Sequence, residues 1–190
     1  GEGDFDRFLN EQLERLLTGD YTTEERILLD VEVIKEDGSK HYLAVNDAVV
    51  ARGQLSKTID LHLTLDGDEI SKYRADGLLF STPTGSTAYS LSAGGPILAP
   101  KMECILMTPV CPHSLFSRSV LFSGESELSV HVKIPEECCC VLTIDGEKNV
   151  PVLATDRVVI RKSDLKLKLA LLHNRNFYKL LNEKLKERDF

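Results

Sequence analysis

The sequence predicts a mainly β domain of two packed, sandwich-like β-sheets, with a short ligand-binding helix and a helix at each end of the chain. Between residues 26 and 172 the chain is a series of short alternating or β-branched runs separated by turn residues, which is typical of strands. The two ends show apolar residues at helical spacing instead. A length of 190 residues is enough for one domain with a substantial core.

Helical spacing sets the predicted domain boundaries. Asp4 is placed to cap a first helix that Gly19 ends. We therefore expect residues 1–22 to form a connecting helix and residues 23–172 to form the β-rich domain. In residues 173–190 the helical spacing returns and predicts a C-terminal helix. The apolar positions are Phe5, Phe8, Leu9, Leu13, Leu16 and Leu17 in the first helix, and Phe177, Leu180, Leu181 and Leu185 in the last.

The β-rich region divides into strands at its turns. Asp66-Gly67 and Asp145-Gly146 each follow an apolar run and are typical of tight hairpin turns. The sequences that contain them, LTLDG and LTIDG, echo each other and suggest two similar sheets. Asp76-Gly77 precedes an apolar run at 78–80 that predicts a buried strand. The other predicted strands are residues 27–34, 42–50, 59–65, 128–134, 141–144 and 158–160.

Residues 77–100 contain no charged side chain, although charged residues make up 28% of the chain. Their pattern predicts a strand, a Gly-containing turn and a short helix over 87–93. Backbone N–H groups at the start of such a helix favour an anion. Thr84, Ser86 and Thr87 would add hydroxyls there, and Gly85 would leave room for a ligand beside the backbone. The alternative is a capped helix in an ordinary core.

Composition narrows the classes of function. The net charge of −7 argues against a nucleic-acid surface, because such surfaces are basic. No apolar run is long enough for a membrane span and no signal peptide opens the sequence, so we expect a cytoplasmic location without membrane contact. Cys138, Cys139 and Cys140 are consecutive and in a strand would point to alternate faces, so no metal site is expected there. P-loop and Rossmann motifs are absent.

Three blocks resemble, in order and spacing, the signatures of NAD kinases, the enzymes that phosphorylate the adenosine ribose of NAD to give NADP. They are NDAVVARG at 46–53, DGLLFSTPTGSTAY at 76–89 and MTPVCPHSL at 107–115. The tail at 177–185 is similar to the helix that ends many bacterial members. The resemblance implies an NAD-binding domain, with phosphate passed from ATP or polyphosphate to the 2′-hydroxyl with the help of Mg²⁺.

One motif of that family has no counterpart here. The sequence contains no Gly-Gly-Asp-Gly-Thr, whose Asp is implicated in catalysis and lies in relatives on an upstream α/β domain. We therefore expect no catalytic residue in this chain. We also expect the C-terminal helix to pack toward that domain, and the chain alone to bind NAD but to catalyse poorly.

The expected NAD-binding residues lie in the first two blocks. An amide beside a carboxylate, as at Asn46 and Asp47, can hold both hydroxyls of a ribose, although a lone Asn-Asp is more often a turn at a strand end. The resemblance implies that both contact the ligand and that Asp76 faces the nicotinamide amide. It also implies a pocket lined by Thr84, Thr87, Ala88, Tyr89 and Ser92.

Arg74 and His113 are further candidates. Their counterparts in the family contact ligand across a subunit boundary, which implies a homo-oligomer, a dimer or a tetramer. Two other readings of the chain stay open. One is a related lipid kinase, and the other is a nucleotide-sensing or oligomerisation module without catalysis.

Overall fold

The computed structural model describes residues 2–53, 58–114, 117–134, 140–173 and 176–187. These residues form two compact units, one of residues 27–167 and one of residues 1–26 with 168–190. Two long strands, β1 (Thr22–Lys35) and β12 (Arg157–Leu171), have residues in both units. Each unit is described by itself below.

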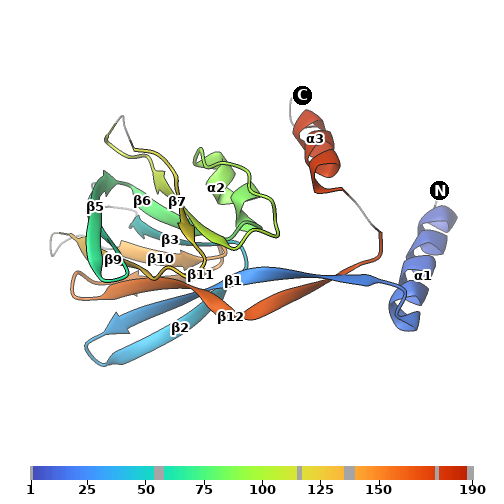
Figure 1. Ribbon diagram of the computed structural model, residues 1–190, viewed down its shortest axis with the longest axis horizontal. Coiled ribbons are helices and arrows are strands. Elements are labelled where there is room, and N and C mark those ends of the chain that lie inside the picture. The colour runs from blue at the N-terminus through green and yellow to red at the C-terminus, as the bar shows by residue number, and fades with distance from the viewer. Residues whose placement is uncertain (1, 54–57, 115–116, 135–139, 174–175, 188–190) are drawn as a thin grey trace. The chain divides into compact units, whose positions relative to one another are not determined.

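The larger unit contains two six-stranded sheets, visible in Figure 1. The first has the order β2-β1-β12-β9-β4-β5 and the second the order β11-β10-β3-β6-β7-β8. The neighbouring strands with an assigned register are all antiparallel. This confirms the predicted mainly β fold of two packed sheets. The remaining strands are β2 (Gly38–Ala44), β3 (Asp47–Arg52), β4 (Ile59–Leu65), β5 (Asp68–Ala75), β6 (Gly77–Ser81), β7 (Cys104–Val110), β8 (Val120–Ser123), β9 (Leu128–Lys133), β10 (Cys140–Ile144) and β11 (Lys148–Val152).

The core lies between the two sheets and follows from alternation along the strands. In β3, Ala48 and Val50 are fully buried in the core cluster, and β6 contributes Leu78 and Phe80. Residues between them on each strand point to the opposite face, because side chains alternate. β3 therefore presents Asp47, Val49 and Ala51 on the side of the second sheet away from the core.

Both predicted hairpin turns are present, one in each sheet. Asp66-Gly67 joins β4 to β5, and Asp145-Gly146 followed by Glu147 joins β10 to β11. The two Asp residues have φ of 51° and 49°, and the two Gly residues have φ of 95° and 72°. Positive φ at both central positions is the geometry that favours Asp-Gly in two-residue hairpins. The echo between the two sequences thus reflects an Asp-Gly pair with positive φ in both sheets, within a two-residue loop in the first and a three-residue loop in the second.

Two predicted elements are wrong in detail. The strand predicted over 42–50 is interrupted at Val45 and Asn46, because β2 belongs to the first sheet and β3 to the second. The helix predicted over 87–93 is instead a 3₁₀ turn (Gly85–Thr87) followed by α2 (Tyr89–Ser92). In sequence an apolar run shows no sign of passing from one sheet to another, because the change depends on which strands pair.

The smaller unit contains both terminal helices. α1 (Glu2–Thr18) ends before Gly19, as predicted, where φ is 76°. It begins before Asp4, so Asp4 lies within the helix rather than capping it. α3 (Phe177–Glu187) follows Asn176, whose side-chain oxygen accepts hydrogen bonds from the backbone N–H groups of Tyr178 (2.9 Å) and Lys179 (3.3 Å).

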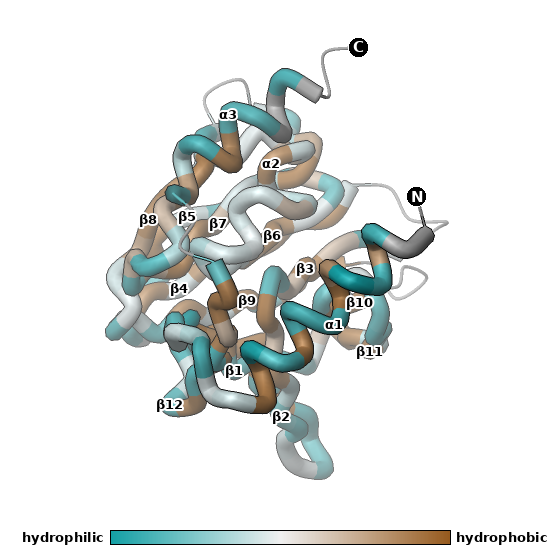
Figure 2. Tube along the Cα trace, turned by 90° about the vertical axis from the view of Figure 1, so that its right-hand side faces the viewer, coloured by the Kyte–Doolittle hydropathy of each residue, from teal (hydrophilic) through white to brown (hydrophobic). Residues whose placement is uncertain are grey.

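The apolar residues of α1 are exposed, and they appear as brown segments along the helix in Figure 2. Among the helices of the described residues, none combines the length and the apolar character that crossing a membrane requires.

Removing a buried side chain between the sheets tests the packing. Leu78 in β6 has no exposed surface. Leu78→Ala is expected to lower the free energy of unfolding by about 2–5 kcal/mol, because transfer free energy is lost and a cavity remains. Urea denaturation measures the change, with the exposed Leu153→Ala as control. A loss below that of the control would contradict this core assignment.

Candidate functional site

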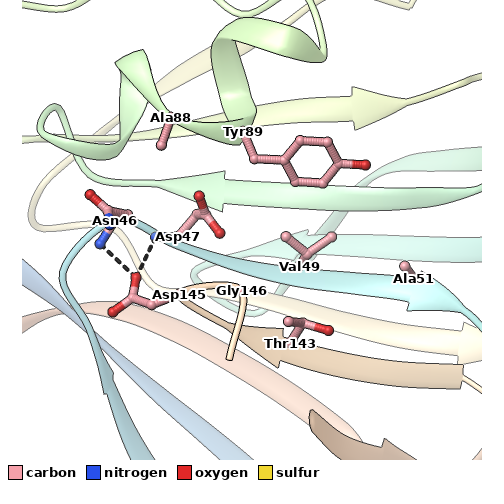
Figure 3. A pocket seen from close by; sticks show the side chains of 9 residues that line it. All are labelled: Asn46, Asp47, Val49, Ala51, Ala88, Tyr89, Thr143, Asp145 and Gly146. Atoms are coloured by element: carbon pink, nitrogen blue, oxygen red, sulfur yellow. Dashed lines mark hydrogen bonds between the residues drawn. The ribbon is translucent and has the colours of Figure 1, made fainter. Parts of the chain in front are cut away.

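A pocket of about 390 Å³ lies on the second sheet, on the face turned away from the core. Figure 3 shows β3 and β10 below it and the segment with Ala88 and Tyr89 above it. The volume is in the range of small-molecule sites. Its lining residues are Asn46, Asp47, Val49, Ala51, Ala88, Tyr89, Thr143, Asp145 and Gly146.

The Asp145 carboxylate organises one end of this pocket. It accepts hydrogen bonds from the backbone N–H groups of Val45 (2.8 Å), Asn46 (2.7 Å) and Asp47 (3.0 Å). The N–H of Asp145 in turn donates to the carbonyl of Asp47 (2.9 Å). Dashed lines in Figure 3 mark the bonds to Asn46 and Asp47. These bonds fix the backbone where the chain passes from β2 to β3. They therefore also fix the positions of the Cα atoms of Asn46 and Asp47, from which the two pocket side chains extend.

The segment after β6 is hydrogen-bonded to the same stretch of backbone, at Val45 and Asn46. Thr82 donates its hydroxyl to the carbonyl of Val45 (2.7 Å) and its N–H to the carbonyl of Asn46 (2.9 Å). A Cβ atom on Gly85 would lie 2.0 Å from the Asn46 carbonyl oxygen. The space beside Gly85 is therefore filled by Asn46, and the expectation that a ligand uses it is wrong.

Two of the three hydroxyls expected to bind an anion, those of Ser86 and Thr87, make hydrogen bonds within the loop. Ser86 is fully buried, donates to the carbonyl of Pro83 (2.7 Å) and accepts from the N–H of Leu98 (3.0 Å). Thr87 donates to the carbonyl of Thr84 (3.3 Å). With α2 only four residues long, the helix N-terminus offers little positive potential.

Asp47 is a buried carboxylic acid in the pocket wall. Its side chain is 5% exposed. Burial, with a smaller contribution from the nearby Asp145 charge, raises the pKa of Asp47 to about 6. Burial acts this way because it disfavours the charged form. Above that pH, Asp47 is an acceptor that gains from any donor a ligand brings.

Asp76 lies at the other end of β3 and is held by Arg52. The guanidinium donates through Nε to Oδ1 (2.7 Å), and a second, longer bond reaches Oδ2 (3.4 Å). The N–H of Arg52 also donates to the carbonyl of Asp76 (2.9 Å). The hydrogen bond to Asp76 raises the pKa of Arg52. Ala51, which lines the pocket, directly precedes this pair.

Four of the eight predicted NAD-binding residues line this pocket. They are Asn46, Asp47, Ala88 and Tyr89. The others do not line it, and they are Asp76, Thr84, Thr87 and Ser92. Arg74 and His113 adjoin each other away from it, since the His113 N–H donates to the Arg74 carbonyl (2.9 Å) and the Arg74 side chain pairs with Asp60 (3.2 Å).

Sequence reasoning missed several pocket residues. The sequence predicts Asp145 and Gly146 only as a turn and Thr143 only as part of a strand. Val49 and Ala51 belong to the block at 46–53, but neither is among the expected NAD-binding residues. Alternation from Asp47 could have found Val49 and Ala51, because residues two apart share a face. Nothing in the sequence pairs β10 with β3, which brings Thr143 and Asp145 to the pocket.

The part of the chain that the structure describes holds no cluster of three or more His, Cys, Asp or Glu residues that could bind a metal ion. Cys138 and Cys139 of the cysteine run lie outside the described residues, and Cys140 is buried.

Comparisons with known proteins agree with one another. The family description "ATP-NAD kinase C-terminal domain" matches residues 45–172. An NAD kinase of Natranaerobius thermophilus is 41% identical over 174 residues, which cover 91% of this chain and 60% of that protein. An NAD kinase of Lachnoclostridium phytofermentans is 36% identical over 182 residues, covering 93% and 64%. The chain thus spans about 60% of the length of the curated relatives it matches.

Solved structures show the same fold. Yeast NADH kinase complexed with NADH superposes with a TM-score of 0.85 at 26% identity, covering 95% of this chain and 55% of that one. An NAD kinase from Archaeoglobus fulgidus in complex with ATP superposes with a TM-score of 0.75 at 26% identity, covering 92% and 64%.

The role of Asp145 can be separated from that of its turn. Asp66 occupies the equivalent position in the other hairpin, where among the described residues its carboxylate accepts one hydrogen bond, from the N–H of Glu127 (2.9 Å). Asp145→Ala is expected to lower the free energy of unfolding by about 3 kcal/mol or more, because backbone donors lose a charged acceptor. Asp66→Ala places Ala at a similar positive φ and so introduces the same backbone strain. It should lower the free energy of unfolding by clearly less than Asp145→Ala does. Equal losses in urea denaturation would contradict the role assigned to Asp145.

Burial of Asp47 predicts a pH-dependent stability. In the folded protein Asp47 keeps its proton up to about pH 6, whereas in the unfolded chain it loses it near pH 4. Its contribution to the free energy of unfolding therefore falls as the pH rises from about 4 to about 6. Asp47→Asn should be more stable than the parent by about 1–3 kcal/mol at pH 7 and nearly equal at pH 4.

Urea denaturation at the two pH values measures this difference, with the exposed turn variant Asp37→Asn as control. An Asp47→Asn protein that gains no stability over the parent at pH 7 would show that the carboxylate is not desolvated.

Proposed function

The chain belongs to the ATP-NAD kinase C-terminal domain family, and from this premise we propose that it is the NAD-binding part of an NAD kinase. The proposed reaction transfers a phosphoryl group from ATP or polyphosphate to the 2′-hydroxyl of the adenosine ribose of NAD. The observation that carries the proposal is the pocket on β3, which brings Asn46 and Asp47 together with Ala88 and Tyr89.

The pocket wall suits a nucleoside. Asp47 can accept from a ribose hydroxyl, and the Asn46 amide can donate or accept. Beside them Val49 and Ala51 form an apolar strip along β3, and Tyr89 lies across from it in Figure 3. A flat base can lie between the aromatic ring and the apolar strip, while the sugar hydroxyls meet the polar end.

The position of the Asp76–Arg52 pair supports binding of a dinucleotide rather than a mononucleoside. It lies next to Ala51, at the end of β3 opposite Asp47. A carboxylate oxygen there can accept from the N–H of a carboxamide such as that of nicotinamide. Arg52 would hold the carboxylate in place. In this proposal Thr84, Thr87 and Ser92 shape the loop that carries Ala88 and Tyr89.

Phosphoryl transfer depends mainly on positioning and on neutralising charge. We propose that this chain positions the acceptor hydroxyl and that the remaining length of its relatives supplies the phosphoryl donor site and the Asp implicated in catalysis. Mg²⁺ would arrive with ATP. The described residues contain no cluster of three or more His, Cys, Asp or Glu residues that could hold it, and we assign it no ligand in this chain.

We also propose a homo-oligomer in which Arg74 and His113 lie near a subunit boundary. The two residues adjoin each other at the end of β5 and in the loop after β7. Neither lines the pocket of its own chain, which agrees with a role toward a neighbouring copy.

Calorimetry with NAD tests the site. Asn46→Ala, Asp47→Ala and Asp76→Ala should each weaken binding by about 10- to 100-fold, the value of a lost hydrogen bond to a charged group or of a comparable polar contact. Asp37→Ala, in an exposed turn, should bind as the parent does. Unchanged affinity in all three variants would refute the site. NADP formation from NAD and ATP by the full-length protein tests the reaction, and phosphorylation of lipid instead would refute it.

A further inference from the structure

Ser81, the last residue of β6, carries a buried hydroxyl without a partner. Its side chain has no exposed surface, and Oγ makes no hydrogen bond with any residue that the structure describes. Within the described part of residues 27–167 it is the one buried side-chain oxygen or nitrogen in this condition. Its neighbours differ, because Thr82 and Ser86 both use their hydroxyls within the loop. Buried hydroxyls in folded proteins are nearly always hydrogen-bonded, so the unpaired hydroxyl of Ser81 needs an explanation.

The strand register places Ser81 directly opposite Asp47. The two residues are paired between β3 and β6. Residues paired in this way point to the same face, with Cβ atoms about 4.5–5.5 Å apart. Both lie on the pocket side, since Ala48 and Phe80 beside them are in the core. One hydrogen bond between the two side chains can span that separation.

The surroundings of Asp47 leave Ser81 as its natural donor. The titratable groups that line the pocket with Asp47 are Asp145 and Tyr89, and no cation lines it among the described residues. Asp145 repels a negative charge on Asp47 and already accepts from backbone N–H groups. Asp47 has no hydrogen-bond partner for its carboxylate among the described residues.

We infer that Ser81 is a positioning residue for Asp47: its hydroxyl donates to the ionised carboxylate and holds it toward the ligand. The rotation of one side chain between staggered positions is enough to make the bond. A donor that binds only the ionised form favours that form. Ser81 therefore sets the pH above which Asp47 can accept a hydroxyl from the ligand. This consequence for the ligand rests on the proposed function, whereas the bond itself does not.

A ¹³C NMR titration of the Asp47 carboxyl tests the bond without any ligand. Ser81→Ala should move the titration midpoint upward by about one pH unit, because the charged form loses a donor. Ser81→Cys retains a weak donor, so its titration midpoint should lie between those of the parent and Ser81→Ala. Ser129→Ala removes a buried serine hydroxyl from the other sheet and should leave the midpoint unchanged. An unchanged midpoint in Ser81→Ala would overturn the inference.

A double-mutant cycle then tests the consequence for binding. NAD affinity, measured by calorimetry from pH 5 to pH 8 in steps of about one unit, should show its pH midpoint raised in Ser81→Ala. In an Asp47→Asn background the Ser81→Ala change should have no effect, because the carboxylate that it positions is gone. Equal weakening at every pH and in both backgrounds would show that Ser81 contacts the ligand itself, and would overturn the positioning role.

The two measurements separate this inference from the proposed function. If the parent protein fails to bind NAD at any pH, the proposed function fails, while the NMR titration still decides whether Ser81 donates to Asp47.

Discussion

The pocket depends on one carboxylate that satisfies the backbone where the chain changes sheets. Between β2 and β3 the N–H groups of Val45, Asn46 and Asp47 all donate to Asp145. Buried backbone donors need partners, and a chain that leaves one sheet for another loses its regular ones there. Asp145 replaces them from the turn of a hairpin distant in sequence. The fold and the floor of the pocket are therefore held by the same bonds.

Two acids at the same place have opposite roles because their surroundings differ. Asp145 accepts several N–H groups, which compensate its charge. Asp47 is buried beside it and has a pKa raised to about 6. A carboxylate that the protein itself leaves undersatisfied costs stability, and in the proposed site that cost would be recovered when a ligand supplies a donor. This is the usual exchange between stability and function at a binding site.

Burial explains the lack of charge over part of residues 77–100. β6 is buried along its whole length, and Thr82, Ser86 and Ser90 are buried after it. Charged side chains could not be placed there without a large desolvation cost. Hydroxyls can, because they find neutral partners, as Ser86 does with Pro83 and Leu98 and Ser90 does with the hydroxyl of Thr108. The hydroxyl-rich composition thus builds the loop, and the pocket receives only Ala88 and Tyr89 from it.

The sequence by itself determined the fold class, the two Asp-Gly hairpins and the family. These rest on local patterns: alternation, turn residues with positive φ, and three motif blocks in order. It also pointed to Asn46, Asp47, Ala88 and Tyr89. Only the tertiary structure decided that the run at 42–50 is split between two sheets, that Asp145 holds its backbone, and that Ser81 faces Asp47. Those facts depend on which strands pair, and strand pairing joins residues whose local sequences carry no sign of each other.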